Sequence, residues 1–186
     1  MRIFLAVFPS PGAQGVAAAA IERLRRPGDG VSWVKRENLH YTLRFMGELG
    51  ASGLKRVVAA AREGVADHRR FEAALGSAGA FPDAARARVL WLGLSVGGEA
   101  LVALARSVEE ALRRRGFERA DHAFTAHLTI GRVRIRDQDW GPRLSGVSLE
   151  ADPLARFVVD TVAVVESTLS PKGSRYEARA EAILES

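Results

Sequence analysis

Two histidine motifs of the same form stand in the two halves of the chain. His40 is followed by Thr42 two residues later, and His127 is followed in the same way by Thr129. Histidine is the one side chain whose ordinary pKa suits both proton donation and proton acceptance near neutral pH. Two imidazoles beside one reacting group could therefore act as an acid–base pair. The threonine hydroxyls could hydrogen-bond the oxygens of a phosphoryl group held between them.

Both motifs lie in segments that predict β-strands, residues 40–46 and residues 126–133. Residues two apart on a strand share a face, so each histidine is expected beside its threonine. Tyr41 and Leu128 then point into the opposite, apolar layer. One copy of so short a pattern is most simply explained as a structural histidine. Two copies, one in each half of the chain, indicate a shared site between two related lobes.

The remaining pattern predicts the elements that must position these strands. Periodicity of 3.6 residues predicts helices over 13–26, over 53–65 with Ser52 as N-cap, and over 99–115 with Gly116 ending the last one. Further strands are predicted over 2–8, 31–34, 71–75, 88–96, 156–166 and 176–184, and a turn or short helix over 137–144. About eight strands with so few helices favour an α+β fold with antiparallel sheets over a doubly wound one.

The composition excludes several classes of protein. The 186 residues include no cysteine, so disulfides, zinc–thiolate sites and thiol nucleophiles are ruled out. No apolar run approaches the roughly 20 residues that span a membrane, and we expect a cytoplasmic protein without membrane contact. The net charge is +5, almost all from arginine. This charge balance would suit a nucleic-acid partner, but it would equally follow from a GC-rich genome.

The motifs resemble a known family. His40-Tyr41-Thr42-Leu43 and His127-Leu128-Thr129-Ile130 are similar to the paired motifs of the 2H phosphoesterase superfamily. The segments 2–7, 33–40 and 44–48 resemble its RNA 2′,3′-cyclic phosphodiesterase branch, the LigT family, and the resemblance extends over essentially the whole chain. It implies a two-lobed LigT-like fold in which two antiparallel sheets face a central groove, with helices on the outside. It also implies one bilobal domain over 1–186, a monomer, and neither cofactor nor metal.

The resemblance further implies roles for individual residues. His40 would be the proton donor and His127 the proton acceptor in hydrolysis of 2′,3′-cyclic phosphate ends of RNA or nucleotides to a 2′-phosphate. Thr42, Thr129 and Arg132 would bind the substrate. Strict alternation places Arg132, five residues after His127, on the wrong face of its strand. We therefore expect a β-bulge or twist near Gly131.

Other readings of the same residues stay open. The reverse reaction, 2′–5′ RNA ligation, uses the same groups with a 5′-hydroxyl in place of water. A non-catalytic RNA-binding module would need only the basic charge. Arg44 shares the face of His40 and either contacts substrate or is solvated. Trp33 and Phe8 either stack on a base or pack between elements, while His68 and His122 are expected at the surface or in loops.

Overall fold

Two antiparallel sheets organise the chain, which the computed structural model describes from Met1 to Ser186. One sheet has four strands in the order β3-β1-β8-β9, and the other has five in the order β2-β6-β5-β4-β7. The strands are β1 (Arg2–Val7), β2 (Val31–Trp33), β3 (Tyr41–Glu48), β4 (Phe71–Phe81), β5 (Val89–Val96), β6 (Leu128–Val133), β7 (Arg156–Val159), β8 (Thr161–Ser170) and β9 (Gly173–Ile183). The helices are α1 (Pro11–Leu24), α2 (Ala51–Val65), α3 (Gly98–Arg114) and α4 (Gly141–Leu144). The predicted α+β fold with two antiparallel sheets is confirmed.

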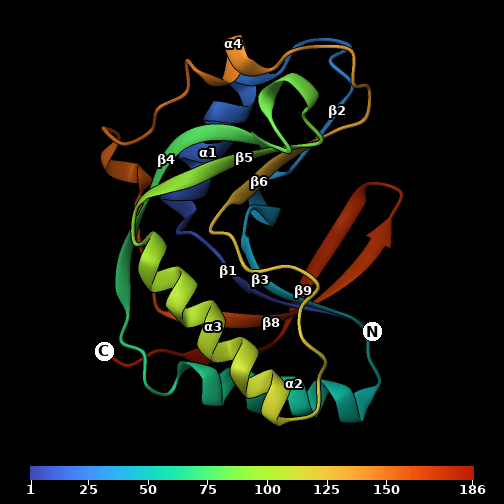
Figure 1. Cartoon of the computed structure of the whole chain (residues 1–186), viewed down its shortest axis with the longest axis vertical. Coiled ribbons are helices and arrows are strands. Elements are labelled where there is room, and N and C mark those ends of the chain that lie inside the picture. Colours follow the sequence, from blue (N-terminus) through green and yellow to red (C-terminus); the bar gives the residue numbers. More distant parts are fainter.

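The helices cover the outer faces of the two sheets (Figure 1). Helix α1 packs on β4 and β7 of the five-stranded sheet, whereas α2 packs on β8 and β9 of the other sheet and against α3. Gly64 of α2 permits this helix pair, because a Cβ there would lie 2.7 Å from the Cα of Val108 in α3. No helix of the chain is long and apolar enough to cross a membrane.

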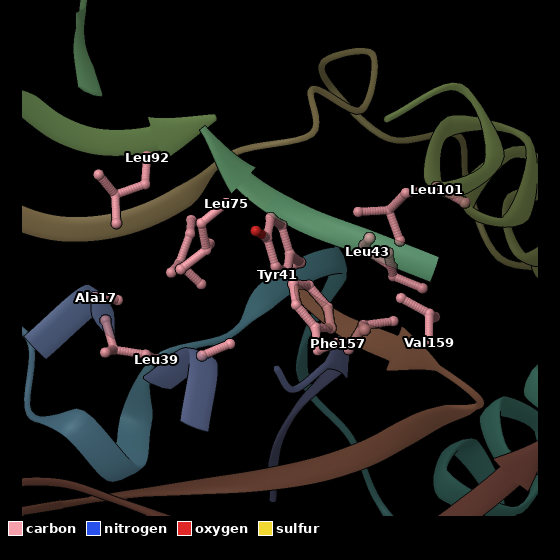
Figure 2. Close-up of a cluster of buried hydrophobic side chains, with 14 of the residues drawn as sticks. Ala17, Leu39, Tyr41, Leu43, Leu75, Leu92, Leu101, Phe157 and Val159 are labelled. Carbon is pink, nitrogen blue, oxygen red and sulfur yellow. The ribbon is translucent and has the colours of Figure 1, made fainter. Parts of the chain in front are cut away.

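One hydrophobic core of 41 buried residues extends over both sheets. Figure 2 shows Tyr41 of β3 at its centre, among side chains such as Leu75 and Phe157 that come from the other sheet. The expected inward orientation of Tyr41 and Leu128 is confirmed, since both are fully buried. Because the core does not divide between the sheets, we infer that residues 1–186 form one bilobal domain.

Several predicted elements were wrong in their bounds or number. The segment 156–166 is two strands, β7 and β8, which belong to different sheets and part at Asp160. The strand predicted to end at residue 75 continues to Phe81, because register shifts after Ala74 and Leu75 absorb the small residues that resembled a loop.

The predicted helix starts also differ from the structure. The first helix begins at Pro11 rather than at residue 13, since Ser10 Oγ accepts a hydrogen bond from the Ala13 amide and proline suits the first turn. Helix α2 begins at Ala51 with Gly50 as its N-cap, so Ser52 is not the N-cap. Lastly, His40 and His127 directly precede β3 and β6 rather than lying within them.

Candidate active site

A cavity of about 410 Å³ brings the two histidine motifs together. His40 and Thr42 reach it from the four-stranded sheet, and His127 and Thr129 from the five-stranded sheet. The expectation that both motifs face one cavity is therefore confirmed. The other lining residues are Val34, Asn38, Leu43, Arg44, Phe45, Ala120, Asp121, His122, Ala123, Phe124, Thr125, Arg132 and Tyr176.

His40 is held by two hydrogen bonds and three aromatic rings. Its Nδ1 lies 2.6 Å from the carbonyl oxygen of Asn38, and its Nε2 lies 2.9 Å from Thr42 Oγ1. Because a carbonyl oxygen can only accept, Nδ1 bears a proton, and in the neutral ring Nε2 accepts from the threonine hydroxyl. The imidazole also packs against Phe4, Phe8 and Tyr176, with ring centroids 4.9 to 5.4 Å away.

His127 repeats this arrangement with one difference. Its Nδ1 lies 2.8 Å from the carbonyl oxygen of Thr125, again two residues upstream, so Nδ1 again donates. The ring packs edge-on against Phe81 at 5.0 Å. Its Nε2 has no hydrogen-bond partner within the protein. The neutral imidazole therefore presents a free lone pair to the cavity, which the His40 ring does not.

The surroundings of both imidazoles favour their neutral forms. Burial lowers the pKa of His40, the hydrogen bond to the Asn38 carbonyl partly offsets this, and the nearby positive charge of Arg132 lowers the pKa further. Burial likewise lowers the pKa of His127, with the Thr125 carbonyl opposing and the charge of Arg132 adding to the shift. One guanidinium thus acts on both histidines at once.

A β-bulge places Arg132 on the cavity side of β6. Trp91 of β5 pairs with Thr129 and the preceding Leu90 pairs with Gly131, so Ile130 is the extra residue. The extra residue reverses the inward and outward alternation, which brings Arg132 to the same cavity as His127. The bulge expected near Gly131 is confirmed.

The first motif has a bulge at the equivalent position. Ala6 of β1 pairs with Thr42 and the preceding Leu5 pairs with Arg44, so Leu43 is the extra residue. In each motif the bulged residue therefore stands three positions after the histidine. Phe45 then occupies the position that corresponds to Arg132, and it lines the cavity as a 60% exposed aromatic ring.

Arg44 is neither a solvated charge nor a free substrate ligand. Its Nη1 atom donates to both carboxylate oxygens of Glu109 on α3 at 2.9 and 3.0 Å, and its Nη2 donates to the Glu118 carbonyl at 2.7 Å. Only 14% of the Arg44 side chain is exposed. Glu109 also accepts from the backbone amide of Ala120. Arg44 and Glu109 together hold Ala120, where the loop begins that lines the cavity and leads to His127.

The weaker sequence candidates fall outside or at the rim of the cavity. Trp33 packs edge-on against Trp140 at 5.9 Å and does not line the cavity, so its packing role is the correct alternative. Phe8 packs against His40. His122 is an exposed loop residue, as expected, on the cavity wall. His68 is half-buried rather than a surface residue, since its Nε2 contacts Ser107 Oγ at 2.8 Å.

Three residues of the site carried no usable signal in the sequence. Asn38 contributes a backbone carbonyl to His40, and any residue type could do so. Tyr176 reaches the cavity from β9, far along the chain from either motif. Phe45 would alternate away from His40 on a regular strand, and only the bulge at Leu43 makes its position understandable.

The chain is similar to known proteins over most of its length. Residues 13–170, which include both motifs, match the model of the 2′-5′ RNA ligase superfamily. The chain belongs to this superfamily. Two curated superfamily relatives are named RNA 2′,3′-cyclic phosphodiesterase. The relative from Archaeoglobus fulgidus is 34% identical over 95% of this chain and 97% of its own length, and the one from Methanothermobacter thermautotrophicus is 32% identical over 95% of each.

Solved structures of other proteins show the same fold. A Thermus thermophilus protein of 28% identity superposes with a TM-score of 0.77 over 99% of this chain and 98% of its own. The LigT protein of E. coli in complex with 3′-AMP, at 22% identity, gives a TM-score of 0.80 over 98% and 97% of the two chains. The resemblance to the LigT-like cyclic phosphodiesterases that the motifs indicated is confirmed at the level of family and fold.

Proposed function

We propose that this chain hydrolyses the 2′,3′-cyclic phosphate ends of RNA, with His127 as the proton acceptor and His40 as the proton donor. The names of the curated relatives support the substrate class. The observation that supports the mechanism is the pair of imidazoles at one 410 Å³ cavity, each oriented through Nδ1 by the carbonyl two residues upstream.

His127 is suited to the base role by its free Nε2 and lowered pKa. A neutral imidazole is the dominant form near pH 7 when its pKa is lowered, so the lone pair is available. It would take a proton from a water molecule as the water oxygen bonds to phosphorus. The geometry supports this role because the hydrogen bond to Thr125 leaves only Nε2 to react.

His40 would protonate the departing 3′ oxygen as the bond between phosphorus and that oxygen breaks, which leaves a 2′-phosphate. The lowered pKa of the free imidazole opposes protonation, but a bound phosphate anion favours the imidazolium. One proton thus arrives on His127 while another leaves His40, and exchange with solvent restores both. Thr42 would keep the His40 ring directed at the leaving oxygen.

The remaining site residues would stabilise the phosphoryl oxygens. Arg132 is exposed to the cavity and supplies a fixed positive charge where negative charge develops. Thr42 and Thr129 line the same cavity from opposite sheets. The Thr129 hydroxyl can donate a hydrogen bond to the substrate, and the Thr42 hydroxyl can do so when His40 is protonated and no longer accepts from it. No three His, Asp or Glu side chains are grouped so as to hold a metal ion. We propose that the reaction needs none.

Turnover of a 2′,3′-cyclic nucleotide in EDTA tests this mechanism. The variants His40→Ala and His127→Ala should each lose about 10²- to 10⁴-fold in kcat, the range typical for removal of a general acid or base. His68→Ala is the matched control, because that histidine contacts Ser107 away from the cavity and should leave kcat unchanged. Full turnover by either active-site variant, or complete loss of wild-type turnover in EDTA, would refute the mechanism.

Ligation is a second candidate, favoured by the name of the superfamily itself. The same groups would keep their roles when a 5′-hydroxyl attacks phosphorus in place of water: His127 would take the proton of the hydroxyl, and His40 would protonate the departing 3′ oxygen, which leaves a 2′–5′ linkage. The two roles would exchange only when that linkage is cleaved back to the cyclic phosphate. Incubation of cyclic-phosphate and 5′-hydroxyl RNA ends should then give a joined product that resists ribonucleases. A non-catalytic RNA-binding module has less support, since binding alone would not require two oriented imidazoles.

A further inference from the structure

A second groove, of about 590 Å³, lies beside the candidate active site. It is formed by the β8–β9 hairpin and the segment before His40, and Figure 1 shows this hairpin projecting from the sheet, away from helices α2 and α3. Three cationic side chains line it, Lys35, Lys172 and Arg175, against the single carboxylate of Glu37. A volume of this size is in the range of about 300–1,000 Å³ that holds small ligands such as nucleotides.

The groove adjoins the candidate active-site cavity. Asn38 and Tyr176 line both. The side-chain amide of Asn38 donates to the Ser174 carbonyl in the hairpin at 3.0 Å, while its backbone carbonyl accepts from His40 Nδ1 at 2.6 Å. The Tyr176 ring packs edge-on against His40 at 5.3 Å. The groove therefore opens next to the imidazole to which we assign protonation of the leaving 3′ oxygen.

The turn of the hairpin is tied to the segment before His40, and the hairpin exposes two cationic side chains to solvent. Lys35 Nζ donates to the Lys172 carbonyl at 2.6 Å, which ties the turn to the segment before His40. Lys172 and Arg175 are both exposed and form no ion pair with a carboxylate of the chain. Arg179, further along β9, instead lies 3.3 Å from Glu166 and 3.7 Å from Glu177. Unpaired cations at one end of the strand are available for an anionic ligand.

We propose that this groove binds the single-stranded RNA immediately 5′ of the cyclic phosphate, a proposal that rests on the proposed function. An RNA that ends in a 2′,3′-cyclic phosphate continues only on its 5′ side, so its backbone must leave the cavity by one path. Proteins bind single strands with cations along the backbone and aromatic rings against the bases. The groove offers Lys172 and Arg175 for the phosphates, and the rings of Phe8 and Tyr176 along its wall.

Comparison of a cyclic mononucleotide with a pentanucleotide tests the groove. The double variant Lys172→Gln/Arg175→Gln should raise KM for a pentanucleotide with a 2′,3′-cyclic end by about 5- to 30-fold, as expected for two exposed ion pairs at the stronger end of their range. Its KM and kcat for 2′,3′-cyclic AMP should not change. Loss of two phosphate contacts should also reduce the salt dependence of pentanucleotide binding by about 1.4 in the slope of log K against log salt.

The control variant removes the same charge elsewhere. Arg62→Gln/Arg106→Gln changes two exposed arginines on the outer helices α2 and α3 and should leave both substrates unaffected. Equal effects of the groove and control variants, or equal effects on pentanucleotide and mononucleotide, would overturn the proposal. Fluorescence anisotropy with a labelled pentanucleotide measures binding to the groove independently of turnover. Absence of cyclic AMP hydrolysis by the wild type would refute the proposed function, whereas unchanged pentanucleotide binding by the groove variant would refute the proposed groove.

Discussion

The ion pair between Arg44 and Glu109 should stabilise the fold and the cavity wall together. Glu109 Oε1 accepts from both Arg44 Nη1 and the Ala120 amide, each at 2.9 Å, so one carboxylate joins β3, α3 and the loop that leads to His127. The two side chains are only 14% and 24% exposed. Substitution of either partner by glutamine would leave the other charge partly buried without its counter-charge.

The magnitude follows from the number and kind of bonds lost. A hydrogen bond to a charged group contributes about 1.5–3 kcal/mol, and partial exposure places these bonds in the lower half of that range. We expect Arg44→Gln and Glu109→Gln each to lower the free energy of unfolding by about 2 kcal/mol. Because both remove the same contact, the double variant should lose less than the sum, with a coupling energy of about 1–2 kcal/mol. Urea unfolding at 25 °C measures all three variants.

An exposed pair provides the control. Arg156 and Glu72 join β7 to β4 at 3.7 Å, with 53% and 66% of their side chains exposed, and their coupling energy should stay below about 0.5 kcal/mol. The Arg44 and Glu109 variants should also lower kcat/KM for a cyclic nucleotide, since the loop they hold lines the cavity. A coupling energy no larger than that of the exposed pair would show that this contact does not hold the loop, and the reasoning would fail.

Three further perturbations test other parts of the structure. Tyr41→Phe should raise the free energy of unfolding by about 1–2 kcal/mol in urea titrations, because the Tyr41 hydroxyl is buried without a hydrogen-bond partner; a loss would reveal an unseen partner. Gly131→Ala should lower the free energy of unfolding by about 1–3 kcal/mol, since the new Cβ would lie 2.8 Å from Val31 Cγ1. Gly98→Ala is the control, because a Cβ there meets open space and should not destabilise the fold. Equal effects of the two variants would contradict this reasoning. Lowered folded-state pKa values mean that the histidines contribute stability above their unfolded pKa of about 6.5 and lose it as pH falls. The free energy of unfolding should thus rise with pH between about pH 5 and 7, and His40→Gln and His127→Gln should each reduce that slope. A slope that neither variant changes would refute the argument.

The sequence was informative where one local rule decides the structure. The two strands that carry the motifs, the Gly116 helix end and the final hairpin all follow from alternation or turn chemistry, and the structure confirms them. The sequence was misleading where contacts with distant parts of the chain decide the structure. Nothing in the run from residue 156 to 166 shows that its two halves belong to different sheets, because both halves have the apolar content of a buried strand. Ser52 is a good N-cap residue in isolation, but the helix has already begun at Ala51.

The cavity itself shows the same division between local pattern and spatial context. Alternation correctly pairs each histidine with its threonine, but it fails five residues after each histidine, since a bulge intervenes at Leu43 and at Ile130. The bulges give the two lobes one geometry, and the residues that follow give them different chemistry. Phe45 on one side supplies an aromatic face, whereas Arg132 on the other supplies a charge that acts on both imidazoles.

In the proposed mechanism, the two His-x-Thr motifs take opposite roles because the surroundings of their imidazoles differ. His40 is enclosed by aromatic rings, and its Nε2 is already bonded to Thr42. His127 has an open Nε2 at the same cavity. Under this mechanism, the second ring receives a proton from water without breaking a bond inside the protein, while the first carries a proton when an anion is bound. The proposed asymmetry between acid and base thus lies in the contacts of the two imidazoles: three aromatic rings and the Thr42 hydroxyl contact His40, whereas only the Phe81 ring packs on His127 and its Nε2 stays open.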